Sequence, residues 1–238
     1  TSIFGMKVDG GSVLVDNTNN DADYFDTPTS NFSTLNPLAP VNSGNFPGSS
    51  TAYQEANLKG NSSGISQAGP WNSTMAISGN DTNTYYWEME VLAVGSGAFP
   101  RIGVIIAPPI NQGTSITPSY LYYSANGTIK QNPDNVHGTA TTLATAASYV
   151  AGDIVSISLN TSTDTITWFK NGTQQYQHTS YDFGNQLTQP VFGQTGAGES
   201  FRVNYGQMPF LYEPANISKL QTNNLPEQAI KNGKEHFD

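Results

Sequence analysis

Residues 85–94 read Tyr85-Tyr86-Trp87-Glu88-Met89-Glu90-Val91-Leu92-Ala93-Val94, and this stretch decides the fold. It is rich in aromatic and β-branched residues, which are enriched in strands. Glu88 and Glu90 are two positions apart, so on a strand their side chains point to the same face. The stretch therefore predicts a strong β-strand, with Trp87 directed to the core.

Short apolar segments on either side of this stretch are separated by polar turns, which predicts further strands. Residues 153–159 alternate, with positions 154, 156 and 158 on one face and positions 155, 157 and 159 on the other. Residues 101–107 are almost all apolar or β-branched, so this strand is expected at the centre of its sheet. Turns are expected at 79–81, 126–127, 160–164 and 171–172. The remaining expected strands are 52–58, 75–77, 120–124, 128–130, 165–170, 190–193 and 201–205.

The composition agrees with an all-β chain and excludes several classes of function. Of the 238 residues, 36% are hydrophobic and 11% aromatic, which is too apolar for a disordered chain. The net charge of −9 argues against nucleic acid and against an anionic membrane surface as partners. The chain has no cysteine, hence no disulfide and no thiolate zinc site. No run of 18 apolar residues is present, so no membrane-inserted helix is predicted.

The chain divides into three parts by pattern. Residues 1–50 hold a hairpin (1–15) and an irregular arm rich in Pro and Asn, expected to lie over the domain or over a neighbouring subunit. Residues 51–212 hold the β-sandwich. Residues 213–238 form a C-terminal extension or a linker to a further domain, with short helices expected at 216–221 and 227–234. Because the chain starts at Thr1 without Met or a signal-peptide pattern, we expect a processed product or a piece of a longer protein.

Six sequence blocks stand in order along the chain: Tyr85-Tyr86-Trp87-Glu88-Met89-Glu90, Arg101-Ile102-Gly103-Val104, Tyr123-Ser124-Ala125-Asn126-Gly127, 152–160, Trp168-Phe169-Lys170-Asn171-Gly172 and 203–210. In order and spacing these blocks resemble the SPRY domain. The resemblance implies a bent two-sheet antiparallel β-sandwich, a lectin-like jelly roll. It also implies a non-enzymatic module that binds peptides or proteins through loops at one end. The loops here are rich in Ser, Thr, Gly and Asn, so no peptide-binding residue can be transferred.

Two flanking segments carry a second resemblance. Residues 26–38 and 222–233 look like the stretches that precede and follow SPRY-like domains in structural proteins of marine bacteriophages. This implies a structural or attachment protein on the virion surface, outside the cell, as part of a fibre, a tail or a decorated capsid. Its partners would be other virion proteins and copies of itself in a homo-oligomer, and a host-surface glycan or protein.

The glutamates of the deciding strand raise the alternative of an enzyme. Side chains two positions apart lie about 6.5–7 Å apart along a strand, and retaining glycosidases hold two carboxyl groups about 5–5.5 Å apart. Lectin-fold glycosidases carry E-x-D-x-x-E on such a strand. Here Glu90 takes the middle place and Ala93 falls where the last acid is needed. No catalytic residue is assigned, and a polysaccharide-cleaving enzyme remains the second alternative.

Aromatic residues beside predicted turns are the candidates for contact with a ligand or partner. An exposed cluster of such rings would make a sugar platform, so a carbohydrate-binding module for host-surface glycans is the first alternative. Capping the core is the simpler role for each ring. The candidates are Trp71, Phe99, Tyr120, Tyr149 and Tyr176.

No metal or cofactor is predicted. The histidines are scattered without the spacing of metal ligands, and they are His137, His178 and His236. An acidic cluster near the start offers oxygen ligands for calcium, but it lacks the EF-hand glycine and reads better as a solvated linker. Its members are Asp16, Asn19, Asp21, Asp23 and Asp26.

Overall fold

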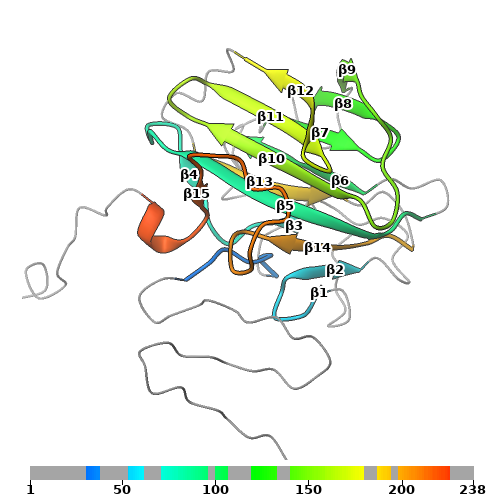
Figure 1. The fold of residues 1–238 in the computed structure, drawn as a ribbon, viewed down its shortest axis with the longest axis horizontal. Helices are drawn as coiled ribbons and strands as arrows, with labels where there is room; N and C mark the ends of the chain where they lie inside the picture. Colours follow the sequence, from blue (N-terminus) through cyan, green and yellow to red (C-terminus); the bar gives the residue numbers. More distant parts are fainter. Residues whose placement is uncertain are drawn as a thin grey trace, which may run out of the picture.

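The deciding stretch forms β5 (Thr84–Ala93) in the computed structural model of the chain. The structure describes residues 31–37, 53–61, 71–95, 100–106, 119–132, 140–179, 187–193 and 198–225. Over these ranges the chain folds into two sheets packed face to face and contains no α-helix (Figure 1). The predicted all-β, two-sheet sandwich is therefore confirmed.

Sheet I is built around β5, which lies between β14 and β10 and is antiparallel to both. A short parallel strand, β15 (Ser218–Lys219), pairs with the end of β5 that β14 leaves uncovered. The order across the sheet is β1 (Tyr53–Gln54), β2 (Lys59–Asn61), β14 (Ser200–Asn204), β5, β10 (Ile154–Asn160), β11 (Thr165–Lys170) and β12 (Thr173–His178).

Sheet II lies behind sheet I in Figure 1. The strand expected at the centre of its sheet forms β6 (Arg101–Ile106), which pairs with β13 (Leu187–Gly193) on one side and β7 (Ser119–Ser124) on the other, as predicted. A short strand, β4 (Ile77–Ser78), also pairs with β13. The order is β3 (Trp71–Asn72), β13 (Leu187–Gly193), β6 (Arg101–Ile106), β7 (Ser119–Ser124), β8 (Thr128–Asn132) and β9 (Thr141–Thr145).

The core fills the space between the two sheets. The odd-numbered residues of 85–91 and of 155–159 point into it. For residues 153–159 this confirms the predicted alternation. Trp87 and Trp168 are both fully buried, as expected for core residues. The rings of Phe192 (β13) and Phe201 (β14) stack across the interface with centroids 5.4 Å apart, so aromatic packing joins one sheet to the other.

The chain enters sheet I by a tighter turn than the sequence suggested. A strand was expected over 52–58, but the structure has the two short strands β1 and β2 joined by residues 55–58. Glu55, Ala56 and Asn57 all have left-handed backbones, with φ of 53°, 52° and 65°. Residues with a Cβ rarely adopt the left-handed backbone conformation. The sequence of residues 52–58 therefore gave no indication of the turn. It places Glu55 and Lys59 beside β14.

The C-terminal extension also differs from expectation. A helix was expected over 216–221, but Asn216 has a left-handed backbone, with φ of 60°. Ser218 and Lys219 pair with β5, and Leu220 is fully buried. The free end of β5 offers ladder hydrogen bonds that outweigh a weak helix propensity. A single 3-10 helix, η1 (Thr222–Asn224), follows, and the second expected helix at 227–234 lies outside the described residues.

Part of the N-terminal arm packs on the sandwich. Leu35 is fully buried and bridges to Ser73, while Phe32 bridges to Gln221 of the C-terminal extension. Of the two expected positions of the arm, residues 31–37 therefore take the one over the domain itself. The hairpin at 1–15 and the acidic cluster at 16–26 lie outside the described residues.

In the part of the chain that the structure describes, no helix is long and apolar enough to cross a membrane.

Candidate functional site

The outer face of sheet I carries a row of polar side chains where its three central strands meet. Because alternate residues of a strand point the same way, Glu88 and Glu90 of β5 share this face. The register sets Asn204 of β14 opposite Glu88, and Arg202 of β14 opposite Glu90. On the other side of β5, Ile154 of β10 lies opposite Glu90. The two glutamates thus have different neighbours.

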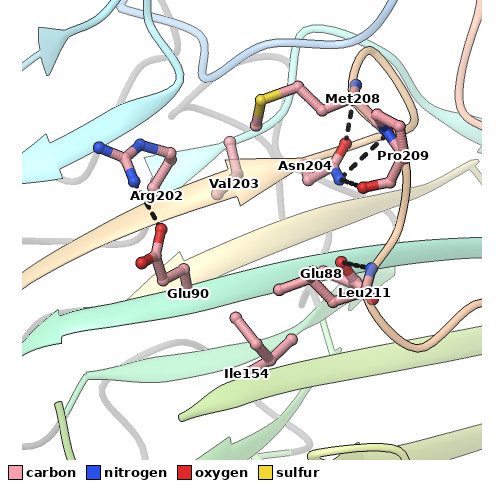
Figure 2. A pocket seen from close by; sticks show the side chains of 9 residues that line it. All are labelled: Glu88, Glu90, Ile154, Arg202, Val203, Asn204, Met208, Pro209 and Leu211. Atoms are coloured by element: carbon pink, nitrogen blue, oxygen red, sulfur yellow. Dashed lines mark hydrogen bonds and ion pairs between the residues drawn. The ribbon is translucent and has the colours of Figure 1, made fainter. Parts of the chain in front are cut away.

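Glu88 fixes the chain that follows β14. Residues 205–212, which we name the closing segment, cross the outer face of sheet I over Glu88 (Figure 2). The Leu211 N–H donates to Glu88 Oε2 (3.0 Å), and the Tyr212 N–H donates to Oε1 (2.9 Å). The Tyr86 hydroxyl lies 3.1 Å from Oε1 and 2.9 Å from the Tyr212 carbonyl, so these two acceptors share its one proton. Glu88 is only 3% exposed, and these donors compensate for burying its charge.

The start of the closing segment is folded around Asn204. Asn204 Oδ1 accepts from the Gly206 N–H (2.9 Å), while its Nδ2 donates to the carbonyls of Met208 and Pro209 (3.2 and 3.3 Å). Gly206 has φ of 110°, a conformation that a residue with a Cβ rarely adopts. Asn204 and Gly206 together explain why the chain reverses here.

Phe210 anchors the middle of the closing segment on the sheet. Its ring packs edge-on against Tyr86, with centroids 4.9 Å apart. The Tyr86 hydroxyl also lies 2.9 Å from the Tyr212 carbonyl. The segment is therefore held by an aromatic contact and by main-chain hydrogen bonds.

Glu90 belongs to a chain of charges. Arg202 Nη1 donates to Glu90 Oε2 (2.6 Å), and Arg202 Nε donates to Glu55 Oε2 (2.6 Å). Glu55 also pairs with Lys59 at 3.6 Å. The hydrogen bond and charge of Arg202 hold the pKa of the Glu55 carboxyl below its ordinary value. The same hydrogen bond with Glu55 raises the pKa of the Arg202 guanidinium.

Between these groups lies a pocket of about 370 Å³, which we name the outer-face pocket. It lies between the ion pair of Glu90 and Arg202 and the closing segment (Figure 2). Its volume falls at the lower end of the range of roughly 300–1,000 Å³ that is typical of ligand sites. Its walls are mainly apolar, with charge at one side. It is lined by Glu88, Glu90, Ile154, Arg202, Val203, Asn204, Met208, Pro209 and Leu211.

Comparison with known families bears directly on these strands. The model of the SPRY domain family matches residues 84–208, which are 125 of the 238 residues. The match runs from the first residue of β5 to Met208 in the closing segment. The chain belongs to the SPRY domain family. The expectation of a SPRY fold is thereby confirmed, and SPRY domains are modules of protein–protein interaction.

Solved SPRY structures resemble the chain at low sequence identity. The SPRY domain of human HERC1 is 19% identical, with a TM-score of 0.45, covering 59% of this chain and 84% of that one. The TRIM65 PSpry domain is 14% identical, with a TM-score of 0.48, covering 73% and 92%. A human SPRY domain is 18% identical, with a TM-score of 0.44, covering 64% and 94%. A search of curated proteins found no match.

Three of the five aromatic candidates, Trp71, Tyr149 and Tyr176, have described side chains, and these three do not form an exposed cluster. Trp71 and Tyr149 are each 1% exposed, and the Tyr149 hydroxyl lies 2.6 Å from the Pro100 carbonyl. Their rings therefore belong to the core and not to a surface. Tyr176 lies on β12, half-buried and stacked on Trp168 at 6.1 Å. Tyr120 lies on β7, but its side chain is outside the described set, as is Phe99.

The two glutamates of β5 do not form a glycosidase pair. Both oxygens of Glu88 are engaged by the closing segment, and Glu90 is paired with Arg202. The place of the third acid in the E-x-D-x-x-E pattern is Ala93, which pairs with Ser200 in the ladder. Of the three histidines only His178 is described, and no group of three His, Cys, Asp or Glu side chains that could hold a metal occurs in the described ranges.

The outer-face pocket was missed at the sequence level. Its apolar side comes from Met208, Pro209 and Leu211, which the sequence shows only as an irregular segment after the last strand. One signal was available. Residues 201–204 alternate apolar and polar, which puts Arg202 and Asn204 on one face together. Their pairing with Glu90 and Glu88 depends on strand order, which the alternation does not reveal.

Proposed function

We propose that this chain is a non-enzymatic structural or attachment protein of a virus particle, in which the SPRY sandwich is the binding domain. In this role many copies are held on the particle surface, outside the cell, next to other virion proteins and to one another. A host-surface protein or glycan is the target of the displayed domain. The membership in the SPRY family supports the binding part of the proposal, and the resemblance of residues 26–38 and 222–233 to phage segments supports its location.

The observation that carries the display role is the way the two flanking segments meet. The Thr222 N–H donates to the Asn31 carbonyl (2.9 Å), and the Asn31 N–H donates to Thr222 Oγ1 (3.1 Å). The Ser33 N–H donates to the Leu220 carbonyl (2.9 Å). The chain therefore arrives at the sandwich and leaves it side by side. A domain attached at one place leaves its remaining surface available to partners, as display on an assembly requires.

The alternatives have less support. A carbohydrate-binding module depends on exposed rings, and Trp71 and Tyr149 are buried. A polysaccharide-cleaving enzyme depends on two available carboxyl groups, and both oxygens of Glu88 accept from main-chain N–H groups.

The proposal is tested by imaging. Antibodies raised against the purified chain would be applied to virus particles of the source sample, followed by gold labelling and cryo-electron microscopy. We expect regular labelling of the particle surface and a repeated density that fits the two-sheet sandwich. Recovery of the chain only as a free monomer in the cytosolic fraction, with unlabelled particles, would overturn the proposal.

A further inference from the structure

We propose that the outer-face pocket is a docking site for a polypeptide segment that presents an apolar side chain next to a lysine or arginine. The inference rests on the binding role proposed for the domain but not on its location on a virus particle. The pocket lies on the face of sheet I, whereas the sequence resemblance predicts binding through loops at one end of the sandwich. The site is therefore additional to that expectation.

The apolar half of the site is held open towards solvent. Leu211 lines the pocket and is 69% exposed, and Tyr212 beside it is 42% exposed. Their amides are both bonded to Glu88, while the preceding Phe210 is buried against Tyr86. The main chain is thus fixed in a position that prevents Leu211 from turning into the core. A partner that covers Leu211 removes apolar surface from water without first ordering the segment.

The floor of the pocket continues this apolar surface. Ile154 of β10 and the side chains of Met208 and Pro209 line it, and Ile154 is 8% exposed. Tyr212 does not line the pocket, so its exposed side chain adds apolar surface next to Leu211 outside the pocket itself. A ligand that fits all of this surface is wider than the pocket, so a polypeptide with one inserted side chain fits better than a small molecule.

The charged half of the site determines the sign of the charge expected on the partner. Arg202 donates to Glu55 through Nε and Nη2 and to Glu90 through Nη1, so its charge is matched by two carboxylates. Only Oε2 of the Glu90 carboxylate pairs with Arg202, and the side chain of Glu90 is 38% exposed. Glu88 adds a buried negative charge on the same wall. Of the two carboxylates that line the pocket, Glu90 is therefore the one that solvent reaches, which favours a cation in the partner.

The net charge of the whole chain acts in the same direction. With 18 acidic and 9 basic side chains, the long-range field attracts basic segments and repels acidic ones. The inserted apolar side chain supplies affinity by burial, and the adjacent cation supplies orientation against Glu90.

The test uses the ¹⁵N-labelled full chain and three peptide probes followed by NMR. The first probe is acetyl-Gly-Ser-Leu-Lys-Ser-Gly-amide, and the others replace its leucine by serine or its lysine by glutamate. We expect saturable shifts of the Glu90, Ile154 and Leu211 amides with the first probe. Replacing the leucine is expected to weaken binding about tenfold or more, since burial of a leucine accounts for about that factor. Replacing the lysine by glutamate is expected to weaken it about tenfold, because the change removes a roughly threefold attraction to Glu90 and adds a repulsion of similar size.

Protein variants distinguish binding at this site from nonspecific hydrophobic binding. Leu211→Ser is expected to weaken binding of the first probe about tenfold. Glu90→Gln is expected to weaken it about threefold at low salt, with the difference shrinking as salt rises. Leu187→Ser is the matched control, because Leu187 is a 44% exposed leucine on sheet II. The spectrum of each variant confirms that it is folded.

The result that overturns the site is equally definite. Absence of shifts at saturating probe, shifts confined to residues outside the outer-face pocket, or equal loss of binding in Leu187→Ser and Leu211→Ser each contradict it. Equal binding of the lysine and glutamate probes contradicts the charge assignment. These outcomes are independent of the particle labelling, so failure of the docking site is distinguishable from failure of the display role.

Discussion

Replacing Glu88 by glutamine tests whether this residue is a structural anchor. The carboxylate accepts from two main-chain N–H groups and lies within reach of the Tyr86 hydroxyl. Glutamine keeps one acceptor oxygen, and its NH₂ group must then face one of the two N–H donors. One charge-assisted hydrogen bond is lost, at about 1.5–3 kcal/mol, and a partly buried donor is left without a partner, at up to about 1–3 kcal/mol.

The expected net loss is about 2–4 kcal/mol, less than the sum because the closing segment can move and let water reach the freed donor. A domain of this size loses roughly 2–4 °C of Tm per kcal/mol, so Tm should fall by at least about 4 °C. Hydrogen exchange read by mass spectrometry should show faster exchange in residues 205–212, because the Leu211 and Tyr212 amides lose their acceptor. Tm is read in the same buffer by circular dichroism.

Glu213→Gln is the matched control, because Glu213 is exposed two residues after Leu211 and its removal changes the net charge equally. We expect its Tm and its exchange pattern to stay at the wild-type values. If Glu88→Gln also left Tm and the exchange of Leu211 and Tyr212 unchanged, the anchoring role would be refuted.

Three further predictions follow from other parts of the molecule. Leu35→Ala should lower the free energy of unfolding by about 2–5 kcal/mol, because Leu35 is fully buried. Leu211→Ala should change it little, because Leu211 is exposed. Equal Tm values of the two variants in thermal melts would contradict the packing of residues 31–37. Gly103→Ala should lower the free energy of unfolding by about 3 kcal/mol or more, since a Cβ there would lie 2.1 Å from the Leu121 carbonyl oxygen. Gly152→Ala should lower it by only about 1–2 kcal/mol, since a Cβ there meets no neighbour and only the left-handed backbone is strained. Urea unfolding that ranked the two variants the other way would argue against the register of β6 and β7. Burial raises the pKa of Asp153, but hydrogen bonds from Val150, Asn171 and Lys170 outweigh it and leave the pKa below its ordinary value. The stability that Asp153 contributes is therefore full above about pH 4 and is lost as the pH drops through its folded-state pKa. Asp153→Asn should flatten this loss in thermal melts recorded over a pH series, and an unchanged slope would exclude the contribution.

The fold was predictable from sequence wherever periodicity was long and unbroken. Residues 153–159 were divided correctly into two faces, and Trp87 in the strand at 85–94 was assigned correctly to the core, because alternation over several positions reflects burial on one side of a sheet. Short elements were not predictable. The turn at Glu55–Asn57 depends on three left-handed residues without glycine, and β15 depends on a ladder position of β5 that only the assembled sheet leaves free.

The candidate site was less accessible for a related reason. Leu211 binds Glu88 across 123 positions of sequence, and no local pattern records such a distance. The aromatic candidates were chosen because they stand beside turns, yet Trp71 is 1% exposed because its ring packs against Tyr53 and Phe201. A turn in sequence fixes the position of the main chain but not whether the adjacent ring points outward or into the core.

Glu88 and Glu90 show how far residue type alone falls short of function. They share a strand, a face and a chemistry, yet Glu88 is 3% exposed while the side chain of Glu90 is 38% exposed. The difference comes from β14, which sets Asn204 opposite one and Arg202 opposite the other. Asn204 folds the chain back over Glu88 and commits that carboxylate to main-chain N–H groups. Arg202 neutralises part of Glu90 without covering it. One glutamate therefore builds the wall of the outer-face pocket, and the other is left at its edge, where a partner can meet it.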